Sequence, residues 1–366
     1  MRKNIIICCD GTANELDEPN RTSNVMQLFC HLKDVDSQRQ VAYYDPGVGT
    51  RGYSFLDGWD QITGWTVDEN VKQAYEFLMN FYEAGDRIYL FGFSRGAYTV
   101  RVLTGLLAKC GILHKRNTNL IDYAFKIFRR RNNEGQAKNF RDILSRTVDV
   151  HFLGVWDTVS TVLRKGYLSP LPDYFRDTIL SSQVRYACQA LAIDDRRRSL
   201  FKPIRWSPPE GLDRMEQVWF AGAHSDVGGG YQSDPDTKRR MANLPLRWMM
   251  KRAYVHGLLL NDFTDLESIA RLDDALATLH WPHRRMPWKL LPFLNGSRTI
   301  PAAEATRDQT KLLYPRLHES VLYRLHHPVT KYHPDNLPVE YDVVDDAGRV
   351  LRQVRVTRPS VSLAEV

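Results

Sequence analysis

The chain has 366 residues, enough for one large domain with an insertion, and its 43% hydrophobic and 25% charged residues exclude disorder over long stretches. Its formal net charge of +7 suggests nucleic acid, but the basic runs at 129–131 and 196–198 lack the interleaved aromatic residues of a single-strand binding surface. We therefore predict no nucleic-acid partner and interpret both runs as solvated helix faces and salt bridges, with peripheral contact to an anionic membrane as the alternative.

Apolar runs bounded by Gly, Asp or Pro predict a series of buried strands along the first two thirds of the chain. They lie at 4–9, 40–44, 87–91, 148–155 and 216–221. Between them, apolar residues recur with helical spacing at 67–82 and 97–109. Strands that alternate with helices favour an α/β fold with a mostly parallel central sheet and helices on both faces.

The later part of the chain departs from this alternation. A polar, proline-bearing segment at 232–236 marks the start of a helical insertion or cap, which we place at 232–315 within a single domain spanning 1–366. This insertion contains an aromatic and proline-rich patch between Trp281 and Phe293. Residues 341–356 alternate around a turn at 345–348 and predict a hairpin.

Targeting signals and cysteines bear on the compartment. The first apolar run is too short for a signal peptide, and no window reaches the roughly 18 apolar residues of a membrane-spanning helix. The five cysteines form no Cys-x-x-Cys pair, which favours reduced packing thiols. We expect a protein that is cytoplasmic as synthesised and needs no metal or organic cofactor.

The strongest motif is Gly92-Phe93-Ser94-Arg95-Gly96, between an apolar strand and a helical run. This is the context of a nucleophile elbow, in which the flanking glycines permit a sharp turn and the serine hydroxyl projects above the sheet. The match predicts an α/β-hydrolase fold with Ser94 as the nucleophile.

A serine hydroxyl is a poor nucleophile until a base takes its proton, and a carboxylate is needed to orient that base. Asp157 ends an apolar strand and is the predicted acid, because ligands bind beyond the carboxyl ends of parallel strands. Two histidines are candidate bases. We favour His224, which follows a convincing strand, over His318, which comes late in the chain. Asp226 stays open as a supporting carboxylate, an alternative acid or a loop cap.

The oxyanion of an acyl-transfer intermediate needs backbone donors. The first is the N–H of Arg95, directly after the nucleophile. The second is expected from Gly11 or Thr12, which follow Asp10 at the end of the first strand. These four residues form the predicted oxyanion and substrate loop.

Four motifs together resemble a largely uncharacterised α/β-hydrolase family whose best-understood relatives are phospholipase effectors of type VI secretion. They begin at Cys9, Gly92, Gly154 and His224, and read CDGT, GFSRGA, GVWDTV and HSDVGGGY. The resemblance covers about residues 3 to 325. It implies an α/β-hydrolase fold and esterase chemistry, with phospholipid acyl chains cleaved by the secreted members. It supports Ser94 as nucleophile and Asp157 as acid, and it favours His224 as the base without excluding His318. For secreted members it also implies type VI export and an immunity or secretion partner.

The leading prediction is therefore a serine carboxylic ester hydrolase that acts on lipid through a Ser94 acyl-enzyme. One alternative is an esterase or thioesterase for small soluble substrates with the same residues. The other is a non-catalytic interaction module on a hydrolase fold.

Overall fold

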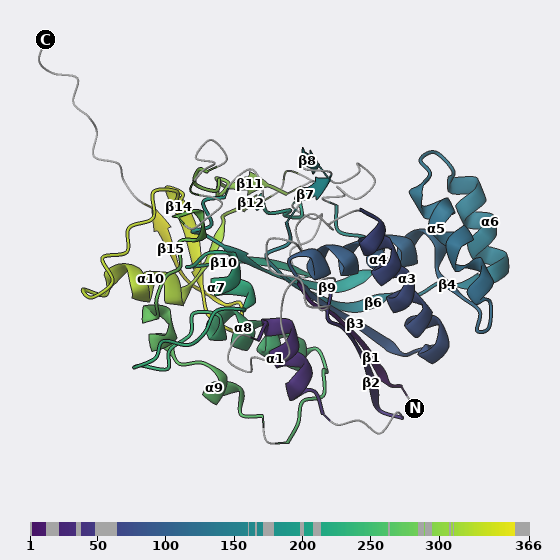
Figure 1. Ribbon diagram of the computed structural model, residues 1–366, viewed down its shortest axis with the longest axis horizontal. Coiled ribbons are helices and arrows are strands. Elements are labelled where there is room, and N and C mark those ends of the chain that lie inside the picture. Colours follow the sequence, from purple (N-terminus) through teal and green to yellow (C-terminus); the bar gives the residue numbers. More distant parts are fainter. Residues whose placement is uncertain are drawn as a thin grey trace, which may run out of the picture.

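The computed structural model describes residues 2–11, 22–33, 38–47, 64–159, 161–164, 167–170, 179–197, 201–207, 214–262, 264–284, 289, 295–306, 309 and 311–355. Through these residues runs a nine-stranded sheet with helices on both faces (Figure 1). The strand order is β15-β14-β13-β10-β9-β6-β3-β1-β2. All neighbours pair in parallel except β14 and β15, which confirms the predicted mostly parallel α/β sheet.

The strands of this sheet are β1 (Asn4–Cys9), β2 (Gln40–Asp45), β3 (Arg87–Phe93), β6 (Val150–Trp156), β9 (Val184–Ala192), β10 (Met215–Phe220), β13 (Arg316–His318), β14 (Glu340–Val344) and β15 (Val350–Arg355). Short pairs lie outside it: β4 (Ile112–Leu113) with β5 (Ser145–Arg146), β7 (Thr161–Arg164) with β8 (Tyr167–Pro170), and β11 (Glu304–Ala305) with β12 (Leu312–Leu313).

The helices are α1 (Asn24–His31), α3 (Gly64–Phe81), α4 (Arg95–Cys110), α5 (Ile121–Arg129), α6 (Glu134–Leu144), α7 (His224–Gly228), α8 (Asn243–Val255), α9 (Leu266–Ile269) and α10 (Glu319–His326). Single 3-10 turns lie at Thr118–Leu120, Leu272–Leu276 and Pro282–Arg284.

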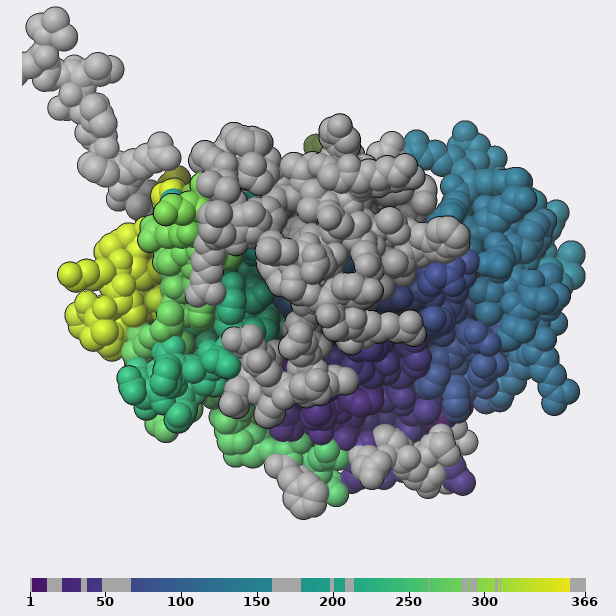
Figure 2. All heavy atoms as spheres, viewed as in Figure 1, coloured from purple at the N-terminus to yellow at the C-terminus, as the bar shows by residue number. Residues whose placement is uncertain are grey.

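Alternate residues of each central strand face opposite layers of helices. Ile5 and Leu90 belong to the core under α3 and α4, whereas Ile6 and Phe91 belong to the core under α1 and α8. Because both faces are covered, the strands read as continuous apolar runs, and this property made five of them predictable. Figure 2 shows the blue residues of α5 and α6 and the yellow C-terminal hairpin at opposite ends of the molecule.

Strand β9 was not predicted, although it lies in the middle of the sheet. Its apolar pattern is interrupted by Arg185 and by Gln189, which is completely buried. The Gln189 amide donates to the Ile204 carbonyl at 2.9 Å, so a local hydrogen bond replaces the apolar side chain that a periodicity argument expects.

Within the predicted insertion at 232–315, α8 packs against the sheet. Trp248 is buried and meets Phe220 of β10 edge to face, with ring centroids 5.7 Å apart. This helix therefore belongs to the main core. In the other parts of this segment that the structure describes, the helices and strands are short, and its role as a cap stays a prediction. Of the aromatic and proline-rich patch, residues 285–288 and 290–294 lie outside the described residues.

The predicted hairpin near the C-terminus is present as β14 and β15, joined at residues 345–349. The five cysteines are unpaired, and all but Cys30 are buried. Among the helices that the structure describes, none has the length and apolar character to cross a membrane.

Candidate active site

Ser94 lies at the turn between β3 and α4, where the nucleophile was predicted. Its backbone has φ 57° and ψ −115°, a conformation that costs energy for a residue with a side chain. The flanking glycines allow this turn. A Cβ on Gly92 would lie 2.6 Å from the Ala97 nitrogen, and a Cβ on Gly96 would overlap the carbonyl oxygen of Cys9.

Gly96→Ala is therefore expected to destabilise the protein by about 3 kcal/mol, because the overlap is with backbone of β1 rather than with a flexible side chain. Gly135→Ala in α6 is the matched control. A Cβ there meets nothing within 4 Å, so the change is expected to stabilise by about 0.5–1 kcal/mol. Urea unfolding of both variants measures the difference, and equal effects would contradict the packing explanation.

Asp157 follows β6, the neighbour of β3, and its side chain is completely buried. Phe93 pairs with Trp156 across the two strands, and the Ser94 N–H donates to the Trp156 carbonyl at 3.1 Å. The predicted nucleophile and the predicted acid are thus held side by side at the carboxyl ends of adjacent strands. Asp157 Oδ1 also accepts from the Ala192 N–H at 3.0 Å.

His224 begins α7, shortly after β10 ends. Its Nδ1 lies 2.6 Å from Asp157 Oδ2. An ionised carboxylate can only accept, so Nδ1 carries the proton and Nε2 has the lone pair that a base needs. The imidazole packs between Phe93 and Phe201, with ring centroids 4.6 and 4.9 Å away, and Phe93 is the residue directly before Ser94.

His318 lies elsewhere, at the end of β13 and three strands away from β6. It is completely buried and stacked on Phe220 at 4.7 Å. Its Nε2 is 3.1 Å from Asp346 Oδ1 and its Nδ1 is 2.8 Å from Ser320 Oγ. Both ring nitrogens are engaged in capping α10 and in binding the hairpin turn, which is a structural environment.

Arg298, which the sequence did not predict, forms a two-point salt bridge with Asp157. Its two terminal nitrogens donate to Oδ1 at 2.7 Å and to Oδ2 at 2.9 Å, and neither side chain is exposed to solvent. A second buried pair, Arg197 with Asp195, lies beside it, and Asp195 accepts from the His224 N–H at 3.2 Å. The basic run at 196–198 predicted salt bridges, but it predicted them on a solvated face.

These charges set the protonation of the pair. Burial alone would raise the pKa of Asp157, but the Arg298 charge and the His224 hydrogen bond outweigh it and hold that pKa below its usual value. Burial lowers the pKa of His224, and the hydrogen bond and charge of Asp157 offset this only in part. Near neutral pH the pair therefore consists of an anionic carboxylate and a neutral imidazole.

Asp157→Asn is expected to lower the free energy of unfolding by about 3–5 kcal/mol at neutral pH, because it leaves buried Arg298 without its charge partner. The depressed pKa of Asp157 means that its contribution is present above the unfolded-state pKa of about 3.9 and is lost as the pH falls through the lower folded-state pKa. Urea unfolding at about pH 7 and in steps down to about pH 3 should show the gap between wild type and variant closing in acid. A gap that stays constant would contradict this assignment.

The loop after β1 approaches the elbow closely. A Cβ on Gly11 would lie 3.4 Å from Ser94 Cβ and 3.1 Å from the Phe93 ring. The Gly11 N–H donates to Asp10 Oδ1 at 2.6 Å. Asp10 Oδ2 accepts from Tyr44 at 2.7 Å and from Ser23. Asp10 thus organises the loop through its carboxylate, while Thr12 lies outside the described residues.

The glycine-rich segment after His224 is joined to the N-terminal part of the chain. Gly229 forms a β-bridge with Ser23. Its φ is +90°, and a Cβ added there would lie 2.6 Å from the Asn24 backbone nitrogen, so this position requires glycine. Asp226, left open by the sequence, accepts from the Ala223 N–H at 2.9 Å and lies 2.7 Å from His280 Nδ1. It caps α7 and binds His280.

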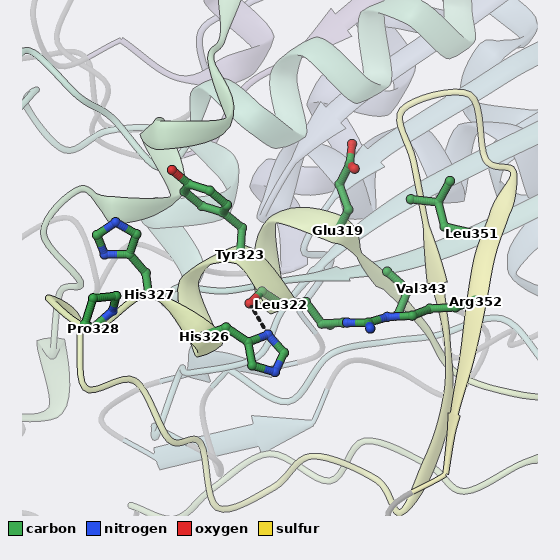
Figure 3. A pocket seen from close by; sticks show the side chains of 9 residues that line it. All are labelled: Glu319, Leu322, Tyr323, His326, His327, Pro328, Val343, Leu351 and Arg352. Atoms are coloured by element: carbon green, nitrogen blue, oxygen red, sulfur yellow. Dashed lines mark hydrogen bonds between the residues drawn. The ribbon is translucent and has the colours of Figure 1, made fainter.

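A separate hollow of about 490 Å³ lies between α10 and the β14–β15 hairpin (Figure 3). Leu322 and Tyr323 line it from α10, and Val343, Leu351 and Arg352 line it from the hairpin. None of the predicted site residues lines this hollow, and we attach no catalytic role to it. Among the residues that the structure describes, no group of three or more His, Cys, Asp or Glu side chains is arranged to bind a metal.

Comparison with protein families gives a match over most of the chain. Residues 3–252 match the family described as T6SS, Phospholipase effector Tle1-like, catalytic domain. The matched range includes Ser94, Asp157 and His224 and ends before Arg298.

Individual proteins are also similar to this chain in sequence or in structure. An uncharacterized protein of Saccharomyces cerevisiae is 32% identical over 250 residues, which cover 61% of this chain and 36% of the relative. This chain therefore spans about a third of the length of that protein. Similar solved structures include the following two. The first is an uncharacterized protein from Pseudomonas aeruginosa, with 19% identity, a TM-score of 0.47 and coverage of 71% of this chain and 46% of that one. The second is the Tle1 effector bound to the VgrG spike from the Type 6 secretion system, with 16% identity, a TM-score of 0.46 and coverage of 75% and 77%.

Proposed function

Because this chain belongs to the family of Tle1-like phospholipase effector catalytic domains of the type VI secretion system, we propose that it is a serine carboxylic ester hydrolase that cleaves acyl esters of phospholipids. The geometry of the site supports this proposal. Ser94 is the nucleophile, His224 the base and Asp157 the acid of this proposal.

One observation carries the proposal: a serine held at φ 57° on a strand-to-helix turn lies beside a buried Asp157–His224 pair joined at 2.6 Å. A backbone strained at one serine has an explanation if the turn presents its hydroxyl to a substrate. A fully buried carboxylate bound to an imidazole fixes which ring nitrogen carries the proton.

In the acylation step, Ser94 Oγ attacks the ester carbonyl carbon while His224 Nε2 takes the hydroxyl proton. The tetrahedral oxyanion accepts from the Arg95 N–H in the first turn of α4, where the helix dipole also favours negative charge. The intermediate then expels the alcohol part of the lipid, which takes the proton from His224. An acyl ester remains on Ser94.

Deacylation repeats the chemistry with water. His224 takes a proton from a water molecule that attacks the acyl carbon, and Ser94 recovers that proton as the fatty acid leaves. The loop at Gly11 and Thr12 supplies the second oxyanion donor. Because the Gly11 N–H donates to Asp10, it must exchange that partner if it serves this purpose.

The proposed partners and export route of this chain are taken from its family membership. We propose a lipid substrate met at a membrane surface, export by type VI secretion, and a secretion or immunity partner. One structural relative, the Tle1 effector, is described as bound to the VgrG spike. A comparable complex with this chain is testable by co-purification.

The test is hydrolysis of short-chain esters and of phospholipid vesicles by the purified protein, with free fatty acid quantified and a fluorophosphonate probe mapped by mass spectrometry. Fatty acid released from vesicles, together with the probe on Ser94, supports a serine phospholipase. Hydrolysis of short esters alone would replace the lipid substrate with small soluble esters. No hydrolysis and no label on Ser94 would favour a non-catalytic interaction module.

A further inference from the structure

Arg298 is one of the largest side chains that is completely buried, and both of its terminal nitrogens bind Asp157. Two nitrogens donate to both oxygens of Asp157. The same nitrogens donate to the carbonyls of Ala192 at 2.9 Å and Phe201 at 2.6 Å. A planar guanidinium held at four points fixes the plane of the carboxylate that it binds.

We infer that Arg298 is a positioning residue, which orients Asp157 toward His224 and neutralises the charge of that carboxylate. The inference rests on the proposed function, because it assigns a role within the same site. It goes beyond the family match, which ends at residue 252, and so adds a residue from a part of the chain that the match does not cover.

The segment that carries Arg298 is itself anchored beside the site. The Gly296 N–H donates to the Arg196 carbonyl at 2.7 Å, and Gly296 bridges to Arg197. The Asn336 amide donates to the carbonyls of Arg298 and Ile193, at 3.0 Å each. The backbone just before Arg298 and at Arg298 itself is thereby linked to residues that follow β9, so the arginine is held at its backbone as well as at its guanidinium.

The positive charge of Arg298 affects the pH at which the His224–Asp157 pair takes up a proton. His224 faces Asp157, Asp195 and Arg197, and Arg298 faces Asp157, with Asp194 and Asp195 nearby. Removing the Arg298 cation lowers the net charge around the His224–Asp157 pair by one unit. The pair then takes up its next proton at a higher pH, whichever of the two residues holds that proton.

The experiment compares Arg298→Gln with Arg298→Lys in the full chain, with rates expressed per site titrated by fluorophosphonate so that unfolded protein does not count. Gln lacks the charge, so we expect kcat/KM to fall about 100-fold and its acid limb to move up by about one pH unit or more. Lys keeps the charge but loses the two-point grip, so we expect about a 10-fold fall with the limb unmoved.

Arg324→Met is the matched control. Arg324 is also a buried arginine, but it donates hydrogen bonds to the backbone carbonyls of Ala275 and Ala277, which lie outside the site. We expect it to lower stability and leave both the rate per site and the acid limb unchanged. Equal rates per site in wild type and both Arg298 variants, or a limb that does not move in Arg298→Gln, would overturn the inference. If Arg298→Gln does not fold, the rate per site of Arg298→Lys decides alone.

A second readout does not depend on hydrolysis. The His224 Nδ1 proton is shielded from solvent and strongly hydrogen-bonded, so it is observable far downfield by proton NMR, and its shift reports the titration of the pair. A titration that moves to higher pH in Arg298→Gln supports the inference even if no ester is hydrolysed. A titration unchanged from wild type overturns it, whatever the outcome for the proposed function.

Discussion

Ser94→Ala is expected to lower kcat for acyl ester hydrolysis by about 10⁶-fold, the loss typical of removing the nucleophile from a serine hydrolase. The free energy of unfolding should hardly change, because alanine keeps the same backbone at the turn and the Ser94 side chain caps no helix N–H. Fatty acid release from vesicles and urea unfolding measure the two quantities on the same preparations.

Ser94→Gly is the informative companion to this variant. Glycine adopts φ 57° without strain, so it should be inactive like Ser94→Ala and yet more stable than wild type by about 1 kcal/mol. A gain of this kind would mean that the backbone strain is kept for the sake of the hydroxyl. If Ser94→Ala retained substantial activity, the nucleophile would have to be another residue.

His224→Gln is expected to cost nearly as much activity as Ser94→Ala, about 10⁶-fold, because the hydroxyl is a poor nucleophile unless its proton is taken. The double variant Ser94→Ala/His224→Gln should be no worse than either single one, since the two residues act as a unit. Additive losses would show that they do not.

His318→Gln is the matched control for this prediction. It breaks the contacts of a buried imidazole with Asp346 and Ser320, so it should destabilise the protein by about 1–3 kcal/mol and leave the rate per titrated site unchanged. The opposite pattern, with activity lost at His318 and retained at His224, would make His318 the base.

Much of the fold was predictable because the local and the tertiary signals agree. Strand β1 is a continuous apolar run and the α3 and α4 helices follow helical apolar periodicity, while the elbow at Ser94 combines a strand, two glycines and a helix within a few residues. Strand β9 was missed because buried Gln189 finds its partner through a loop. An apolar pattern in the sequence does not reveal a polar residue that is buried because it forms a hydrogen bond.

The candidate site was only partly predictable. Asp157 and His224 could be singled out because each follows a strand. Whether Asp157 pairs with His224 or with His318 depends on the order of the strands in the sheet, which the sequence does not show. Arg298 left no signal at all. It lies 141 residues from Asp157 in the sequence and has neither a motif nor a strand end beside it. Long-range ion pairs of this kind come from the packing of segments and not from their composition.

The reversed direction of the last strand also has a consequence for behaviour in solution. Strand β14 has buried Tyr341, Val343 and Val344, and β15 covers its open side in the antiparallel direction with mostly exposed residues that include Arg352 and Arg355. Charged edge strands discourage one sheet from extending into another molecule. We therefore expect the hairpin to limit association through the sheet edge, and a protein shortened before β15 to self-associate more readily at high concentration.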